Sequence, residues 1–167
     1  MNQALYQWLE QHALPYQRFD HPPVYTCDEA RRLCPDLPGA GTKNLFLRDG
    51  KGRRHFLVCV PEHKSVDLKA LGAALDAKGL SLASAQRLQD KLGITPGSVS
   101  LLALVNDAGR QVELVMDPAI WHADAVLALP LLNTQTLALP QQSLRRFLTL
   151  TGHEARVVDV PVQGEPC

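Results

Sequence analysis

The stretch NLFLRDGKGRRHFLVCV, residues 44–60, places two apolar runs on either side of a glycine-containing turn. Each run has the length and the β-branched and aromatic content of a strand. The four residues Asp49-Gly50-Lys51-Gly52 supply the turn chemistry of a β-hairpin. We therefore expect antiparallel strands at 44–48 and 55–60, so that a β-sheet forms the centre of the fold.

Helical and extended patterns flank this hairpin on both sides. Residues 16–24 contain His21-Pro22-Pro23 and should be extended, because proline removes backbone donors. Apolar periodicity and capping residues predict helices at 2–13, from Asp28 through Cys34, from Ser65 or Asp67 to about Leu75, from Ser84 to Leu92, and at 141–150. Further strands are expected at 99–105, 111–116, 125–129, 134–139 and 156–160.

These elements predict an α+β fold in which a mixed sheet or open barrel is flanked by helices. We expect one domain over residues 1–167, with a frayed tail at 161–167. The chain is 46% hydrophobic and 20% charged, as in ordinary soluble proteins. It has no apolar run of about 20 residues, and its N-terminus has no signal-peptide pattern. A cytoplasmic protein with no membrane partner is expected.

The four cysteines, Cys27, Cys34, Cys59 and Cys167, show no C-x-x-C spacing, and the six histidines are scattered. We expect reduced, structural thiols, no metal and no cofactor. The net charge of zero argues against a broad nucleic-acid-binding surface. A local basic run is formed by Arg48, Lys51, Arg53, Arg54 and His55, and we interpret this run as a solvated hairpin turn.

Several strings carry more specific information, and their order and spacing resemble one family. They are Asp20-His21-Pro22-Pro23-Val24, Gly41-Thr42-Lys43-Asn44-Leu45-Phe46-Leu47, Val66-Asp67-Leu68-Lys69, Leu92-Gly93-Ile94-Thr95-Pro96-Gly97-Ser98-Val99, Val105-Asn106-Asp107 and Pro130-Leu131-Leu132-Asn133-Thr134. Together they resemble the YbaK/ProX family of tRNA editing proteins, including the editing domain of bacterial prolyl-tRNA synthetase. The resemblance covers about Leu5 to Val160.

This resemblance implies hydrolysis of the ester that joins a wrong amino acid to the 3′ end of a tRNA. The closest branch is the stand-alone type that clears alanine from the proline tRNA, which makes this aminoacylated tRNA the expected partner and prolyl-tRNA synthetase a further one. It also implies direct attack by water, assisted by a ribose hydroxyl of the tRNA. No G-x-S-x-G elbow surrounds Ser98, so an acyl-enzyme on that serine is not expected.

The expected catalytic residues are Lys43, Gly97 and Ser98. Lys43 matches the functional lysine of the family, at a loop-to-strand junction where its ammonium reaches a phosphate or a substrate oxygen; by position alone it is a surface lysine. The amides of Gly97 and Ser98 are candidates for an oxyanion hole. The alternative for this pair is a plain turn before a buried strand.

Five further residues are expected to bind substrate. Asn44 is a candidate for contacting the ribose or the amino group, and Asn133 and Thr134 lie in the loop that forms the pocket wall in the family. His21 either shapes the pocket or caps a turn. Leu129 stands where the family has histidine, a difference that bears on which amino acid is accepted more than on hydrolysis itself.

Two other functions remain open at this stage. The first is a catalytically weak or inactive module that has kept the fold and binds tRNA or a synthetase, which the missing histidine favours. A small-molecule hydrolase or binding protein unrelated to tRNA is the other, and zero net charge is its only support.

Overall fold

The hairpin predicted at 44–60 forms the middle of a five-stranded sheet. In the computed structural model, which describes residues 2–26, 29, 32–33 and 37–163, strand β2 (Thr42–Arg48) pairs antiparallel with β3 (His55–Pro61). The Asp49 carboxylate accepts hydrogen bonds from the amides of Arg53 and Arg54, which closes the turn. The basic run is thus a hairpin turn, as interpreted, although His55 itself is buried.

The five-stranded sheet is mixed, with the order β4-β2-β3-β5-β8. Strand β4 (Ser81–Leu82) pairs antiparallel with β2, whereas β5 (Val112–Met116) is parallel to β3, and β8 (Ala155–Val157) is parallel to β5. A second, antiparallel sheet has the order β1-β7-β6, formed by Gln17–Asp20, Gln135–Pro140 and Ala125–Ala128.

The two sheets meet at the start of β2. A parallel bridge joins Ala40 to Val126, and the Thr42 hydroxyl donates to the Leu127 carbonyl at 2.7 Å. These contacts bring the beginning of β2 against β6 of the smaller sheet. The arrangement is the expected α+β fold with a mixed, open sheet flanked by helices.

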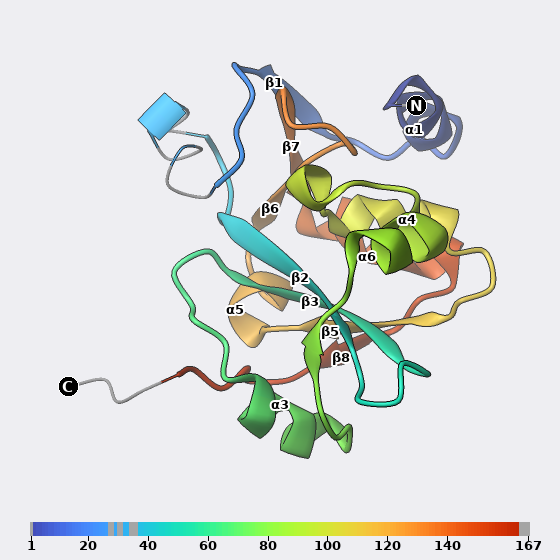
Figure 1. The fold of residues 1–167 in the computed structure, drawn as a ribbon. Helices are drawn as coiled ribbons and strands as arrows, with labels where there is room; N and C mark the ends of the chain where they lie inside the picture. Colours follow the sequence, from blue (N-terminus) through green and yellow to red (C-terminus); the bar gives the residue numbers. More distant parts are fainter. Residues whose placement is uncertain (1, 27–28, 30–31, 34–36, 164–167) are drawn as a thin grey trace.

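Helices cover both faces of the larger sheet, so its central strand β3 is buried along its whole length (Figure 1). On one face Leu57 and Cys59 join a cluster that includes residues of α1 (Asn2–Gln11), α4 (Ala85–Leu92) and α6 (Gln141–Thr151). On the other face Phe56, Val58 and Val60 pack against Leu71 and Leu75 of α3 (Leu68–Leu75). This two-sided burial explains the near-continuous apolar run of β3.

The capping residues predicted from the sequence are confirmed in two helices. The Asp67 carboxylate accepts from the Ala70 amide at the start of α3, and the Ser84 hydroxyl accepts from the Arg87 amide at the start of α4. The helix α5 (Pro118–Trp121) is similarly capped by Asp117. A helix is expected from Asp28 to Cys34, and both of these residues lie outside the described residues. Cys27 and Cys167 also lie outside them.

Two sequence-based predictions were wrong. The apolar run 99–105 is not a strand: Leu101–Asn106 forms a 3-10 helix whose start is capped by the Ser100 hydroxyl, which accepts from the Leu102 amide. An apolar run carries no period, so burial alone did not distinguish the two conformations. Residues 161–163 are not frayed either, because Pro161 and Gln163 form backbone hydrogen bonds with Asp67 and Ser65.

Candidate active site

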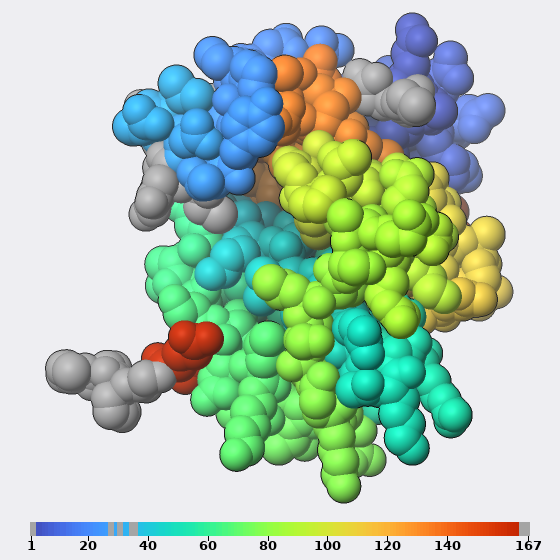
Figure 2. Space-filling view, viewed as in Figure 1, coloured from blue at the N-terminus to red at the C-terminus, as the bar shows by residue number. Residues whose placement is uncertain are grey.

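A pocket of about 300 Å³ lies where β2 begins, between the two sheets and the segment that precedes β2. Figure 2 shows the start of β2, in teal, recessed below the N-terminal segment in blue and beside yellow-green residues that follow α4. The predicted residues that line it are His21, Lys43, Asn44, Gly97 and Leu129. Strings that are distant in the sequence therefore meet at one cavity, as expected for a ligand site.

Lys43 and Asn44 project from the first half of β2. The Lys43 ammonium donates a hydrogen bond to the main-chain carbonyl of Lys64, and an ammonium has two further N–H donors. The Asn44 Oδ1 atom is buried and has no hydrogen-bond partner among the described residues. A buried polar atom without a partner costs free energy, so a ligand that donates to Asn44 Oδ1 would gain this interaction.

His21 forms part of the wall through two hydrogen bonds. Its Nδ1 lies 2.8 Å from the Pro22 carbonyl and its Nε2 lies 2.8 Å from the Thr136 hydroxyl. A carbonyl only accepts, so Nδ1 carries a proton. In the neutral imidazole Nε2 then accepts from Thr136. His21 thus lines the pocket with both ring nitrogens engaged within the fold, and its contact with the Pro22 carbonyl is also that of a histidine that caps a turn.

Asn133 and Thr134 lie behind the wall rather than in it. The Asn133 carbonyl accepts from the Val24 amide at 3.1 Å, and the Thr134 carbonyl accepts from the His21 amide at 3.0 Å. These two bonds hold the segment 21–24 along the connection between β6 and β7. Asn133 and Thr134 therefore do not line the pocket themselves, and they affect it by holding the segment 21–24 in place.

Gly97 and Ser98 differ in their position, although they are neighbours. Gly97 lines the pocket within the short 3-10 helix Pro96–Ser98, whereas Ser98 is buried and does not line it. The Ser98 amide donates to the Thr95 carbonyl at 2.9 Å, which closes that turn. Of the two amides considered for an oxyanion hole, the Ser98 amide is already engaged in the turn.

The pocket also contains residues that the sequence reasoning missed, among them Thr42, Glu62, Thr136 and Tyr25. The register of the hairpin predicts the position of Glu62. Thr42 pairs with Pro61, so the next residue, Glu62, lies opposite Gly41, and the Glu62 amide donates to the Gly41 carbonyl. No comparable signal exists for Thr136, because the pairing of β1 with β7 joins distant segments. Tyr25 is 70% exposed beside Gly97.

The one cysteine in the described part of the chain is not a nucleophile. Cys59 is fully buried in β3, and burial raises the pKa of its thiol to about 12, with the nearby Asp117 carboxylate adding to the increase. The thiolate is the reactive form, so this thiol is inert at neutral pH.

Asp107, in the string Val105-Asn106-Asp107, has a structural role. The Asp107 carboxylate accepts from the amides of Gln111 and Val112 and contacts His153 Nε2 at 2.9 Å. Within residues 2–26, 29, 32–33 and 37–163, no three His, Cys, Asp or Glu side chains gather to hold a metal ion. No helix of those same ranges is long and apolar enough to cross a membrane.

Comparison with known proteins gives a consistent result. Residues 21–147 match the family described as the aminoacyl-tRNA editing domain. The chain is 33% identical over 158 residues to the prolyl-tRNA editing protein ProX of Acetoanaerobium sticklandii, covering 95% of this chain and 96% of that one. It is 38% identical over 136 residues to the prolyl-tRNA synthetase associated domain-containing protein 1 of Danio rerio, covering 80% and 73% of the two chains.

Solved structures share the fold. A crystal structure described as that of a candidate trans-editing enzyme for prolyl tRNA synthetase superposes with a TM-score of 0.71 at 20% identity and covers 98% of each chain. The crystal structure of the hypothetical protein APE2540 superposes with a TM-score of 0.72 at 22% identity, covering 93% of this chain and 97% of that one.

Proposed function

Because the chain belongs to the family of aminoacyl-tRNA editing domains, we propose that it is a trans-editing deacylase that removes a wrongly attached small amino acid, alanine first, from the proline tRNA. The relative from Acetoanaerobium sticklandii is named for editing of prolyl-tRNA, and it matches this chain over nearly its whole length. Prolyl-tRNA synthetase is proposed as a further partner on the same basis.

One observation carries the proposal: Lys43, Asn44 and Gly97 lie around one small pocket together with Leu129. They come from three separate strings of the sequence, and each supplies a different group. Lys43 brings a positive charge, Asn44 a side-chain amide, and Gly97 a close approach of the main chain. Charge stabilisation and positioning are the two requirements of ester hydrolysis that a rigid site can meet.

The proposed reaction is hydrolysis of the ester between the amino acid and the ribose of the terminal adenosine. Water attacks the carbonyl carbon, and the carbonyl oxygen becomes an oxyanion in the tetrahedral intermediate. The bond from that carbon to the ribose oxygen then breaks, the ribose oxygen takes up a proton, and the free amino acid leaves. A ribose hydroxyl of the tRNA assists the water, in line with the family resemblance.

Each pocket residue has a proposed role in this reaction. The Lys43 ammonium offsets negative charge, either on the oxyanion or on the terminal phosphate. Asn44 Oδ1, which has no partner in the described part of the chain, accepts from a ribose hydroxyl or from the substrate ammonium. The Gly97 amide faces the carbonyl oxygen. His21 and Thr136 form a fixed wall through their mutual hydrogen bond.

The size and lining of the pocket support a small aliphatic substrate. Its volume of about 300 Å³ is at the low end for ligand sites, and Val99, Leu127 and Leu129 contribute apolar surface. One methylene changes binding by only about 1–3 kcal/mol, so a synthetase needs a second site that sorts by size. A pocket that admits alanine and excludes proline provides that second site.

A catalytically weak or inactive binding module is the second candidate, since Leu129 replaces the histidine expected from the family. One assay separates the two. Proline tRNA is charged with alanine, serine, 2-aminobutyrate or proline, and release of each amino acid is followed with and without the protein. Faster release of alanine than of proline supports the deacylase, and binding without release supports the module.

A further inference from the structure

A largely buried ion pair, in which the Lys64 side chain is 16% and the Asp117 side chain 4% exposed, lies close to the pocket at the edge where the parallel strands end. Lys64 follows β3, Asp117 follows β5, and Asp159 lies just beyond β8. Neighbouring parallel strands end at the same edge of a sheet, so the residues that follow these strands lie close together there. This edge also holds the start of β2, because β2 runs antiparallel to β3.

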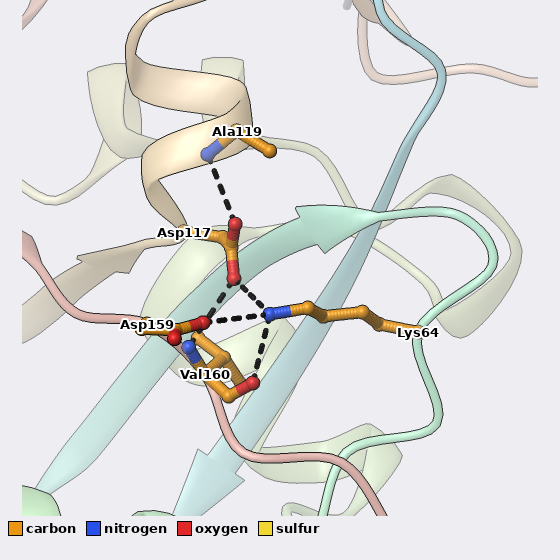
Figure 3. Close-up of polar contacts among 5 residues, drawn as sticks. All are labelled: Lys64, Asp117, Ala119, Asp159 and Val160. Atoms are coloured by element: carbon orange, nitrogen blue, oxygen red, sulfur yellow. Dashed lines mark hydrogen bonds and ion pairs between the residues drawn. The ribbon is translucent and has the colours of Figure 1, made fainter. Parts of the chain in front are cut away.

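The geometry of this cluster is centred on the Lys64 ammonium (Figure 3). Lys64 Nζ lies 2.5 Å from Asp117 Oδ2, 3.2 Å from Asp159 Oδ1 and 2.8 Å from the Val160 carbonyl oxygen. The two carboxylates differ in their surroundings, because the Asp117 side chain is 4% exposed and the Asp159 side chain is 91% exposed. A solvated ion pair contributes little, so Asp117 is the partner that fixes Lys64.

Asp117 is itself held from three sides. Its Oδ1 accepts from the Ala119 amide at 2.9 Å, and its Oδ2 accepts from the Val160 amide at 3.2 Å as well as from Lys64. Burial raises the pKa of Asp117, but the hydrogen bonds from Lys64, Ala119 and Val160 outweigh this effect and leave it lowered. The carboxylate is therefore charged and rigidly placed at neutral pH.

The main chain of Lys64 connects this cluster to the pocket. Its carbonyl oxygen accepts the hydrogen bond from the Lys43 ammonium. A side chain fixed by Asp117 and a carbonyl that directs Lys43 thus belong to the same residue. The main chain of this loop is also held by hydrogen bonds from the Lys64 amide to the Pro61 carbonyl and from the Gln163 amide to the Ser65 carbonyl, so the Lys64 side chain is a further anchor beside this carbonyl.

We propose that Lys64, anchored by Asp117, is a positioning residue that directs the Lys43 ammonium into the editing pocket. This inference rests on the proposed function for its catalytic consequence, although not for its geometry. The competing explanation is that the ion pair only stabilises the fold, by joining the ends of β3, β5 and β8. The two explanations differ in what happens to Lys43 when the Lys64 side chain is removed.

The test compares Lys64→Met with the matched control Asp159→Asn in the full chain. Methionine keeps an unbranched stem and the main-chain carbonyl but removes the ammonium, whereas Asp159→Asn removes only the exposed partner. The first readout is the rate at which Lys43 is methylated by formaldehyde and a mild reductant in the native protein, measured on its peptide by mass spectrometry. The second readout is kcat/KM for release of alanine from the proline tRNA.

We expect Lys64→Met to raise the methylation rate of Lys43 several-fold and to lower kcat/KM on the order of ten- to hundred-fold, with the control unchanged in both. An unchanged methylation rate would overturn the positioning role. A raised rate with wild-type kcat/KM would show that the position of Lys43 does not matter to turnover, which also overturns the proposal.

Two further comparisons keep this result separate from other failures. If Lys64→Met does not fold, Lys64→Gln also removes the ammonium while it keeps a polar side chain, and both readouts are applied to it with the same criteria. If the wild-type protein releases no amino acid from any charged tRNA, the proposed function fails, while the methylation rates still decide the geometry.

Discussion

Leu129 lies directly after β6 on the wall of the pocket, half-buried rather than in the core. We predict that Leu129→His changes the order of preference among alanine, serine and 2-aminobutyrate on the proline tRNA. An imidazole adds a hydrogen-bond donor where the present side chain offers only methyl groups. Differences of this kind are worth about 1–3 kcal/mol, so relative rates should shift by roughly ten-fold or more.

The measurement is the release rate of each amino acid by the variant and by the wild type, together with urea unfolding of both. A pocket-facing residue predicts altered preference with nearly unchanged stability. If stability and the order of substrates both stay the same, Leu129 has no influence on specificity. A large loss of stability would instead place position 129 in the packing of the core.

His55 gives a residue-scale prediction that concerns stability. It is 3% exposed, its ring stacks on Phe46, and Arg87 Nη1 donates to its Nε2 at 3.0 Å. Burial lowers the pKa of His55 below 6.5, and the cations of Lys91 and Arg87 lower it further. Between the lowered folded pKa and 6.5, the unfolded chain binds more protons than the folded chain.

The free energy of unfolding should therefore be largest above this window and should decrease as the pH falls through 6.5 toward the folded pKa of His55. Urea unfolding of the wild type and of His55→Asn at about pH 7.5 and about pH 5.5 tests this, because the window begins near the ordinary histidine pKa. The variant should show a smaller decrease. Equal decreases in the two proteins would mean that His55 does not carry the effect.

At the scale of elements, two glycines lie in contrasting surroundings. A Cβ atom at Gly97 would meet Tyr25 Cδ1 at 3.7 Å, an ordinary contact, whereas a Cβ at Gly72 in α3 would meet the Ala77 carbonyl oxygen at 2.4 Å. Gly97→Val should therefore leave stability nearly unchanged and lower deacylation on the order of ten-fold or more, by placing methyl groups beside the substrate. Gly72→Ala should cost about 1–3 kcal/mol of stability.

The two variants are measured together for unfolding free energy and for deacylation rate per folded molecule. Gly72→Ala serves as the control for a loss of stability without a change in the pocket. If Gly97→Val loses stability and activity in proportion, Gly97 serves only the turn and is not part of the substrate site. If Gly97→Val keeps full activity, the pocket does not bind substrate near the 3-10 helix Pro96–Ser98.

The elements that the sequence could predict are those with a local signal. The hairpin 44–60 is defined by its turn residues, and α3 and α4 by Asp67 and Ser84 at their first turns. The segment 99–105, apolar except for Ser100, has no such signal, since an apolar run suits any buried conformation. The start of the 3-10 helix is capped by the hydroxyl of Ser100, a residue type that is also favoured in turns.

At the scale of the whole molecule, the pairings that bring together the pocket and the ion pair beside it join distant segments. The parallel pairing of β3 with β5 and of β5 with β8 depends on the packing of both sheet faces, which no short motif encodes. The sequence therefore indicated Lys43, Asn44, Gly97 and Leu129 by resemblance. It did not indicate Thr136 or the ion pair of Lys64 with Asp117, since only the tertiary fold brings these groups together.

The zero net charge of the chain is compatible with a site that takes only the end of a nucleic acid. Broad binding along a duplex needs many phosphate contacts and an excess of Lys and Arg. A pocket of about 300 Å³ needs only to receive the aminoacyl group and its ribose. We therefore propose that the chain acts at a tRNA 3′ end, with Lys43 as the cation that hydrolysis requires.

The most direct test is single-turnover release of alanine from proline tRNA charged with alanine, measured for the wild type, Lys43→Ala and Lys51→Ala. Lys51 is the matched control, because it is an exposed lysine in the hairpin turn and does not line the pocket. We predict rapid release of alanine by the wild type and by Lys51→Ala. In folded Lys43→Ala the activation barrier for release should be higher by about a few kcal/mol. None of the three proteins should release proline from correctly charged tRNA. Release by folded Lys43→Ala at the wild-type rate, or no release of alanine by the wild type, would contradict the account.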